Sequence, residues 1–246
     1  MTETVSSPVL LALKRHRFAF LMCALLVLIL LAPLFGPGPM AAVDVAILFS
    51  IVVFCFALTA TRKALTLAVV LVWLALTLGQ VYSHGLIALV GMDVALLVVC
   101  LLAIESAVRR ALKPGAVGTE ELCAAISAYV LMGIGWAAAY SVLQTLDPTA
   151  LNVSVGQATK HWNALLYFSF ATLTTLGYGD LTPTSDFARS LTSVQAITGT
   201  IYLAILIAHL VGNFRGLAPL KTEAGDADMS TLDQMLTANK HHPMKD

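Results

Sequence analysis

A run of seven residues, "TTLGYGD" at positions 174–180, combines residue types that could bind an ion through backbone atoms. Gly177 and Gly179 alternate with larger residues, and glycine adopts positive φ at little steric cost. The alternation lets successive carbonyls point to the same side, and the hydroxyl of Thr175 can extend their row. A column of oxygens in a dry setting can replace the hydration shell of a monovalent cation. The run therefore predicts a cation site built mainly from backbone oxygens.

The composition places this run in a membrane protein. Of its 246 residues, 59% are hydrophobic and 11% are charged, whereas soluble domains have about 45–50% and about 25%. The net charge is zero, so nothing indicates nucleic acid as a partner. The chain contains no paired carboxylates, Ser/His constellation or metal-spaced histidines, and its four cysteines lie in apolar stretches without metal-ligand spacing. We therefore expect neither an enzyme nor a cofactor.

The elements that must position this run are helices. A membrane-spanning helix needs about 20 mostly apolar residues, and six stretches qualify: 18–35, 41–60, 64–83, 86–105, 121–143 and 191–213. Residues 161–173 are also apolar, but at about 1.5 Å per residue they reach only roughly 20 Å. We predict an all-α membrane protein with six transmembrane helices, and a re-entrant helix followed by the "TTLGYGD" loop.

The basic residues orient these spans. Of the 14 lysines and arginines, all but Lys160 and Arg189 fall on one side of this topology. By the positive-inside rule both termini are cytoplasmic. The alternative for residues 1–42 is a cleaved signal peptide, but the apolar run is long for one and favours a retained span.

A Pro-Gly break at residues 114–115 separates two groups of spans. The predicted segments are a cytoplasmic N-terminus (1–17), a four-span bundle (18–106), a cytoplasmic linker (107–118), a two-span unit (119–214) and a short cytoplasmic tail (215–246). The tail is too short for a ligand-binding domain of ordinary size.

The two-span unit resembles the pore domain of small prokaryotic potassium channels of the ion-channel superfamily, over roughly residues 120–214. The resemblance rests on "WNALLYFSFATL", "TTLGYGD" and "SLTSVQAITGTIYLAILIAHLVGNF", which match a pore helix, a selectivity filter and an inner helix. It implies that the filter coordinates K⁺ through Thr175, Leu176, Gly177 and Tyr178, with Gly179 completing it. It further implies Asp180 at the outer mouth and Thr174 and Trp162 as filter supports. Leu176 stands where valine is commoner, but its carbonyl is retained.

The resemblance also implies an assembly and an activity. Four such strands must surround one axis, so a homotetramer is expected, embedded in the lipid of the plasma membrane and carrying passive K⁺ flux. K⁺ would then be the permeant ion and not a cofactor. Two alternatives stay open: a non-selective monovalent cation channel, and a non-conducting sensor subunit with a pore-like fold.

Gating residues are less sharply defined. Gly199, near the middle of the last span, fits a hinge or close helix packing equally well. Further along, Ile207, Leu210 and Val211 could form an apolar constriction. His209 beside them is a candidate pH sensor or an interfacial histidine.

The fourth span determines whether voltage sensing is expected. A sensor needs several arginines inside the membrane field, and this span has none before Arg109. We therefore expect no intrinsic voltage sensing. Asp44 and Asp93 are intramembrane carboxylates, for which a structural polar contact is slightly favoured over an ion or proton role.

Overall fold

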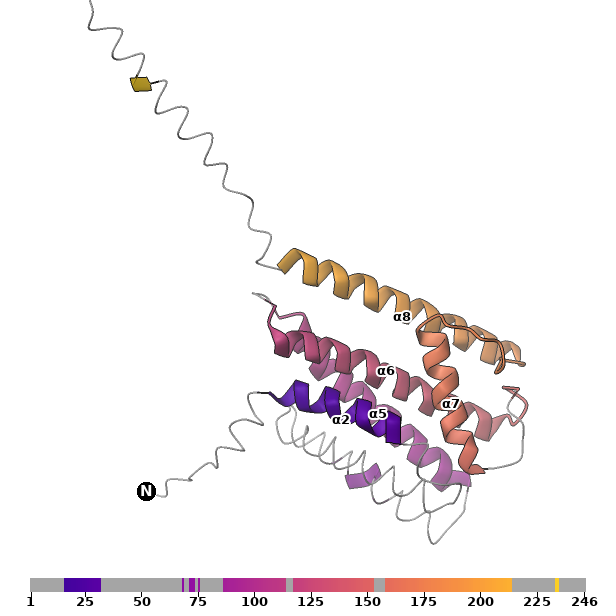
Figure 1. Cartoon of the computed structure of the whole chain (residues 1–246). Coiled ribbons are helices and arrows are strands. Elements are labelled where there is room, and N and C mark those ends of the chain that lie inside the picture. Colours follow the sequence, from indigo (N-terminus) through magenta and orange to yellow (C-terminus); the bar gives the residue numbers. More distant parts are fainter. Residues whose placement is uncertain are drawn as a thin grey trace, which may run out of the picture.

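The structure is a computed structural model. It describes residues 16–31, 68, 71–73, 75, 86–113, 117–152, 158–213 and 233–234. Its helices are α2 (Arg17–Leu31), α5 (Leu86–Ala111), α6 (Thr119–Leu146), α7 (Ala158–Leu173) and α8 (Asp186–Asn213) (Figure 1). Within these ranges the only strand-like pairing is an isolated bridge between Leu151 and Pro183. The predicted all-α class is confirmed.

Three of the described helices, α5, α6 and α8, are long and apolar enough to cross a membrane. Helix α2 has 15 residues and covers the first predicted span from residue 18 to residue 31. The second and third predicted spans, 41–60 and 64–83, lie outside the described residues apart from a few isolated positions. The count of six spans therefore stays a prediction.

Helix α5 continues beyond its predicted end at residue 105, as far as Ala111. Two features of its sequence explain the extension. Arg109 forms an ion pair of 2.8 Å with Glu105 one turn earlier, which stabilises a helix at this spacing. Arg109 and Arg110 also lie in the last turn, where positive charge interacts favourably with the helix dipole.

Helix α6 is the central element of the described structure. Helices α2 and α5 lie on one side of it and α8 on the other, while α7 crosses beside α6 and α8 (Figure 1). Small side chains allow the close approach of α5 to α6: Ala103, Ala107 and Ala111 recur every fourth residue and are at most 4% exposed. Close packing through small residues is typical of membrane helices.

Charged residues join three helices at the end opposite the 174–180 loop (Figure 1). Arg110 at the end of α5 pairs with Glu121 at the start of α6, at 2.9 Å. The neighbouring Glu120 accepts a hydrogen bond of 3.3 Å from the amide of Phe18 in α2. These contacts tie the predicted four-span bundle to the two-span unit.

Candidate functional site

The half-length helix α7 ends directly before the predicted cation site. It has 16 residues, close to the re-entrant helix predicted at 161–173. The four amides that follow it all donate back to its last turn: Thr174 to the Phe170 carbonyl (2.9 Å), Thr175 to Thr172 (3.0 Å), and Leu176 and Gly177 to Ala171 (2.8 and 3.2 Å). The start of the loop is therefore held by the carbonyls that end α7.

The backbone of the loop alternates in sign of φ. Thr175, Gly177 and Gly179 have φ of 58°, 53° and 81°, and no other described residue has positive φ. In an ordinary strand the carbonyls point alternately to the two sides of the strand. A change in the sign of φ at every second residue can turn all of these carbonyls to the same side. A non-glycine residue in this region costs of order 1–3 kcal/mol, so the surrounding structure must hold Thr175 in place. The glycine pattern alone did not indicate this strain at Thr175.

The carbonyl oxygens of residues 174–179 accept no hydrogen bond from the described part of the chain. The side chains here are exposed in the single chain, with Leu176 at 53% and Tyr178 at 69%. Backbone carbonyls are strong acceptors that need a partner when they are removed from water. A cation would be such a partner. No group of His, Cys, Asp or Glu in the described ranges could hold a metal ion instead.

Asp180, predicted at the outer mouth, is linked to α7. Its Oδ1 accepts a hydrogen bond of 3.1 Å from the hydroxyl of Tyr167. The sequence had indicated Asp180 but not Tyr167, which lies 13 residues earlier within an apolar helix. The carboxylate is thereby held next to the end of the loop, where its charge favours cations.

The two predicted filter supports occupy different places. The hydroxyl of Thr174 donates 2.7 Å to the Phe170 carbonyl, at the end of α7. Trp162, in the first half of α7, packs against the hydrophobic core that contains Leu131 and Leu166. No hydrogen bond links Trp162 to residues 174–180 within the described chain.

Gly199 lies where α8 meets the end of α7. A Cβ atom at this position would lie 2.7 Å from the carbonyl oxygen of Leu173 and 2.8 Å from its Cδ1. Helix α8 runs without a break from Asp186 to Asn213. Of the two alternatives for Gly199, close packing is the one that this contact shows, and the hinge stays a prediction.

The predicted constriction residues lie on the far half of α8. Ile207 and Val211 are 59% and 60% exposed in the single chain, and Leu210 is half-buried. The buried residues of α8 are Ala188, Gln195 and Gly199, all nearer the loop. The far half of α8 therefore presents apolar side chains away from the described part of its own chain.

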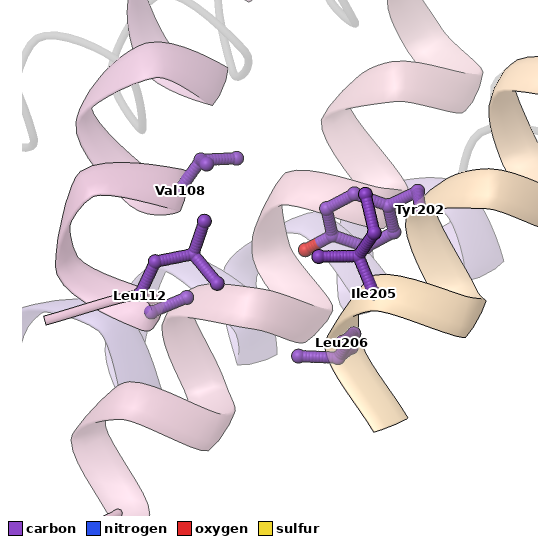
Figure 2. A pocket seen from close by; sticks show the side chains of 6 residues that line it. Val108, Leu112, Tyr202, Ile205 and Leu206 are labelled. Carbon is purple, nitrogen blue, oxygen red and sulfur yellow. The ribbon is translucent and has the colours of Figure 1, made fainter. Parts of the chain in front are cut away.

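A cavity of about 120 Å³ lies between the end of α5 and α8. Its lining comprises Val108, Ala111, Leu112, Tyr202, Ile205 and Leu206 (Figure 2). Because its lining is almost entirely apolar and offers no row of oxygens, the cavity does not suit an ion.

Of the two intramembrane carboxylates, Asp44 lies outside the described residues. Asp93 on α5 is 4% exposed and accepts a hydrogen bond of 2.6 Å from the hydroxyl of Ser141 on α6. Among the residues that the structure describes, no basic side chain pairs with Asp93. This arrangement is a structural polar contact between two helices, the alternative that the sequence slightly favoured.

The sequence of this region matches known channels. Residues 128–215, from within α6 to just after α8, match the family model described as "Ion channel". The chain is 36% identical over 72 residues to the potassium voltage-gated channel protein shk-1 of Caenorhabditis elegans, covering 26% of this chain and 13% of that protein. It is 39% identical over 74 residues to the probable potassium channel protein 2 of Methanocaldococcus jannaschii, covering 28% of this chain and 21% of that protein.

These matches are to channels and not to enzymes, and the chain spans only a small part of the length of either relative. No solved structure matches the chain significantly. The apolar helices and the matched domain together make this a membrane protein. Residues 128–215 are therefore similar to an ion-channel domain, and the two relatives that resemble this region are named a potassium channel and a probable potassium channel.

Proposed function

We propose that the chain is the subunit of a homotetrameric, potassium-selective channel that carries passive K⁺ flux across the plasma membrane. One observation carries the proposal: a loop with alternating φ signs and unpartnered carbonyls follows a half-length apolar helix. Irregular backbone at membrane depth is tolerated only where it is buried in protein or lines water. The similarity to two relatives, one named a potassium voltage-gated channel and the other a probable potassium channel, supports K⁺ as the ion.

The tetramer follows from what one chain supplies. A K⁺ ion that sheds its water needs oxygens on all sides, and each chain contributes one row, at Thr175, Leu176, Gly177 and Tyr178. Four rows around one axis would complete the site. The exposed side chains of the loop and of the far half of α8 are then the surfaces that neighbouring subunits cover.

Three features support a preference for cations. The C-terminal end of α7 carries partial negative charge, and no lysine or arginine occurs within residues 172–188. Asp180 adds a carboxylate at the outer mouth. K⁺ is the permeant ion in this scheme and not a cofactor.

We further propose that the channel does not sense voltage by itself and has both termini in the cytoplasm. The only basic residues of α5 are Arg109 and Arg110, in its last turn, and each is paired with a carboxylate, Glu105 and Glu121. A voltage sensor instead places several arginines within the membrane field.

Recording from the purified protein in planar bilayers tests these proposals together. With K⁺ on one side and Na⁺ at equal concentration on the other, we expect the current to reverse far from zero, at a potential that makes the K⁺ side negative, and we expect a shallow conductance–voltage curve. Reversal near zero would indicate a non-selective cation channel, and a steep curve would contradict the absence of voltage sensing.

Rubidium uptake into proteoliposomes tests whether ions pass through this loop, with Gly177→Asp as the matched control. The wild type should take up rubidium, and Gly177→Asp, which places a side chain at a positive-φ position of the loop, should not. No uptake by the wild type would favour a non-conducting sensor subunit, and equal uptake by the two proteins would show that rubidium does not enter through this loop.

A further inference from the structure

A buried polar bridge joins α6, α7 and α8 behind the 174–180 loop, which is the conducting loop in the proposed function. Its centre is Gln195 of α8, which is 0% exposed, as are Ser169 of α7 and Tyr140 of α6. The Nε2 of Gln195 donates to both the carbonyl and the hydroxyl oxygen of Ser169, each at 2.9 Å. Its Oε1 accepts from the hydroxyl of Tyr140 at 2.5 Å. One side chain therefore bonds to the other two helices at once.

The remaining members of the bridge are also fixed. The Ser169 hydroxyl donates to the carbonyl of Gly133 on α6 at 2.7 Å. The ring of Tyr140 packs edge-on against Phe168 of α7, with 4.9 Å between ring centroids. A fully satisfied buried polar network specifies one arrangement of its elements, because any other arrangement leaves unpaired groups in a low dielectric.

A neutral carboxamide supplies all the donors and acceptors that this position requires. Gln195 must donate to oxygens on α7 and accept from a phenol on α6, and a glutamine side chain has two N–H donors and one carbonyl acceptor. An ionised carboxylate would have no donor and would face the Ser169 carbonyl. An aliphatic side chain would remove the hydrogen bonds from α8 to Ser169 and would leave the Tyr140 hydroxyl only its 3.5 Å contact with the Thr192 hydroxyl.

The bridge acts on the part of α7 that holds the loop. Ser169 lies directly before the residues of α7, Phe170 to Thr172, whose carbonyls accept the amides of residues 174–177. A rotation or shift of α7 relative to α8 would therefore move the loop carbonyls. We infer that Gln195 is a positioning residue for ion selectivity, which fixes α7 so that the carbonyls of residues 175–178 keep their spacing; this inference rests on the proposed channel function.

Gln144 offers a matched control on α6. It is also buried, at 5% exposure, and both ends of its amide are bonded: Nε2 donates 2.7 Å to the Pro148 carbonyl and Oε1 accepts 3.2 Å from the Leu151 amide. These partners lie in the loop after α6 and not on α7. Replacing Gln144 tests the loss of a buried amide without touching the support of the conducting loop.

The test compares K⁺/Na⁺ permeability ratios of the wild type, Gln195→Glu, Gln195→Leu, Tyr140→Phe and Gln144→Glu, each as an assembled tetramer in bilayers. At about pH 9 we expect Gln195→Glu to lower the ratio about tenfold, because the carboxylate has lost the donor. At about pH 5 the protonated form regains one donor, so the ratio should recover. Tyr140 is the only titratable group that hydrogen-bonds this position in the described chain.

Gln195→Leu should show the lowered ratio at both pH values. Tyr140→Phe, which removes one hydrogen bond and keeps the ring, should lower it by a smaller factor. The K⁺/Na⁺ permeability ratios of the wild type and of Gln144→Glu should be the same at both pH values. If the permeability ratio of Gln195→Glu recovers at low pH, a general loss of folding cannot explain the lowered ratio at high pH. The same protein then serves as its own control.

An unchanged ratio in both Gln195→Glu and Tyr140→Phe overturns the inference, and so does a pH response in Gln144→Glu equal to that in Gln195→Glu. If Gln195→Glu does not assemble, an unchanged ratio in Tyr140→Phe is sufficient to overturn it. The wild-type recording tests the proposed function separately: a selective wild type with unaffected variants refutes only the role of Gln195.

Discussion

The hydroxyl of Tyr129 on α6 donates a hydrogen bond of 3.0 Å to the carbonyl oxygen of Leu173, the last residue of α7. The Tyr129 ring stacks on Tyr202 of α8 at 5.9 Å between centroids, and the Tyr202 hydroxyl donates 2.7 Å to the Ala125 carbonyl. Two stacked tyrosines thus connect α6 and α8, and Tyr129 is the one whose hydroxyl bonds to the residue directly before the 174–180 loop.

We expect Tyr129→Phe to reduce the stabilisation that K⁺ gives the protein. The change removes a hydrogen bond worth about 1 kcal/mol from the support of the loop and keeps the stacked ring. A ligand that binds only the folded state raises its stability, so the unfolding midpoint in K⁺ should exceed that in Na⁺. This difference should be smaller in Tyr129→Phe.

Tyr202→Phe is the control, because it removes one hydrogen bond of similar length away from the loop. It should lower the midpoint in both salts and leave the difference between them intact. The same narrowing in both variants would contradict a specific role for Tyr129.

The contact of Gly199 with Leu173 predicts that Gly199→Ala destabilises the protein by about 1–3 kcal/mol. The new Cβ would lie 2.7 Å from a backbone oxygen, so one of the two helices must move. Gly212→Ala, on the same helix, would meet no atom within 4 Å and should be neutral or stabilising by up to about 1 kcal/mol. Denaturant unfolding of the two variants measures the difference. Wild-type stability in Gly199→Ala, with altered channel opening, would instead support the hinge.

The close contact between Gly133 of α6 and Phe170 of α7 predicts that a change at one position can compensate for a change at the other. A Cβ at Gly133 would lie 2.4 Å from the ring of Phe170, so Gly133→Ala should push α7 outward and reduce flux. Phe170→Leu, which removes the ring, should restore much of the loss when the two changes are combined. A double-mutant cycle on stability should therefore show favourable coupling between these sites, and strictly additive losses would contradict the contact.

The two ion pairs of α5 should differ in strength. Arg110–Glu121 joins two helices, and its side chains are 32% and 16% exposed, whereas Arg109–Glu105 lies within one helix at 70% and 35%. We expect a coupling energy of about 1 kcal/mol for the first pair and a few tenths for the second. Double-mutant cycles with glutamine at each position measure both, and equal couplings would argue against Arg110–Glu121 as a tie between the two groups of helices.

The parts of the fold that depend on local pattern could be predicted from the sequence. The short apolar run at 161–173 indicated a helix too short to span the membrane, and the structure has Ala158–Leu173. Gly177 and Gly179 indicated positive φ, as observed. Thr175 could not be recognised in the same way, because its backbone is held by α7 and not by its own preference.

The hydrogen-bond partners that lie far apart in the chain could not be predicted from the sequence, for a different reason. A glutamine or a carboxylate in an apolar helix indicates that a partner exists, but its identity depends on how the helices pack. Gln195 bonds to Ser169, 26 residues away, and Asp93 to Ser141, 48 residues away. Tyr129 and Leu173 are separated by 44 residues. Each pair depends on how α5, α7 and α8 pack around α6.

The absence of a side chain at Gly133 has a consequence for how related sequences can diverge. The space that a methyl group would take is filled by the ring of Phe170, so neither position is free to change alone. Homologous chains that keep this crossing of α6 and α7 should substitute the two positions together, with a larger residue at one accompanied by a smaller residue at the other.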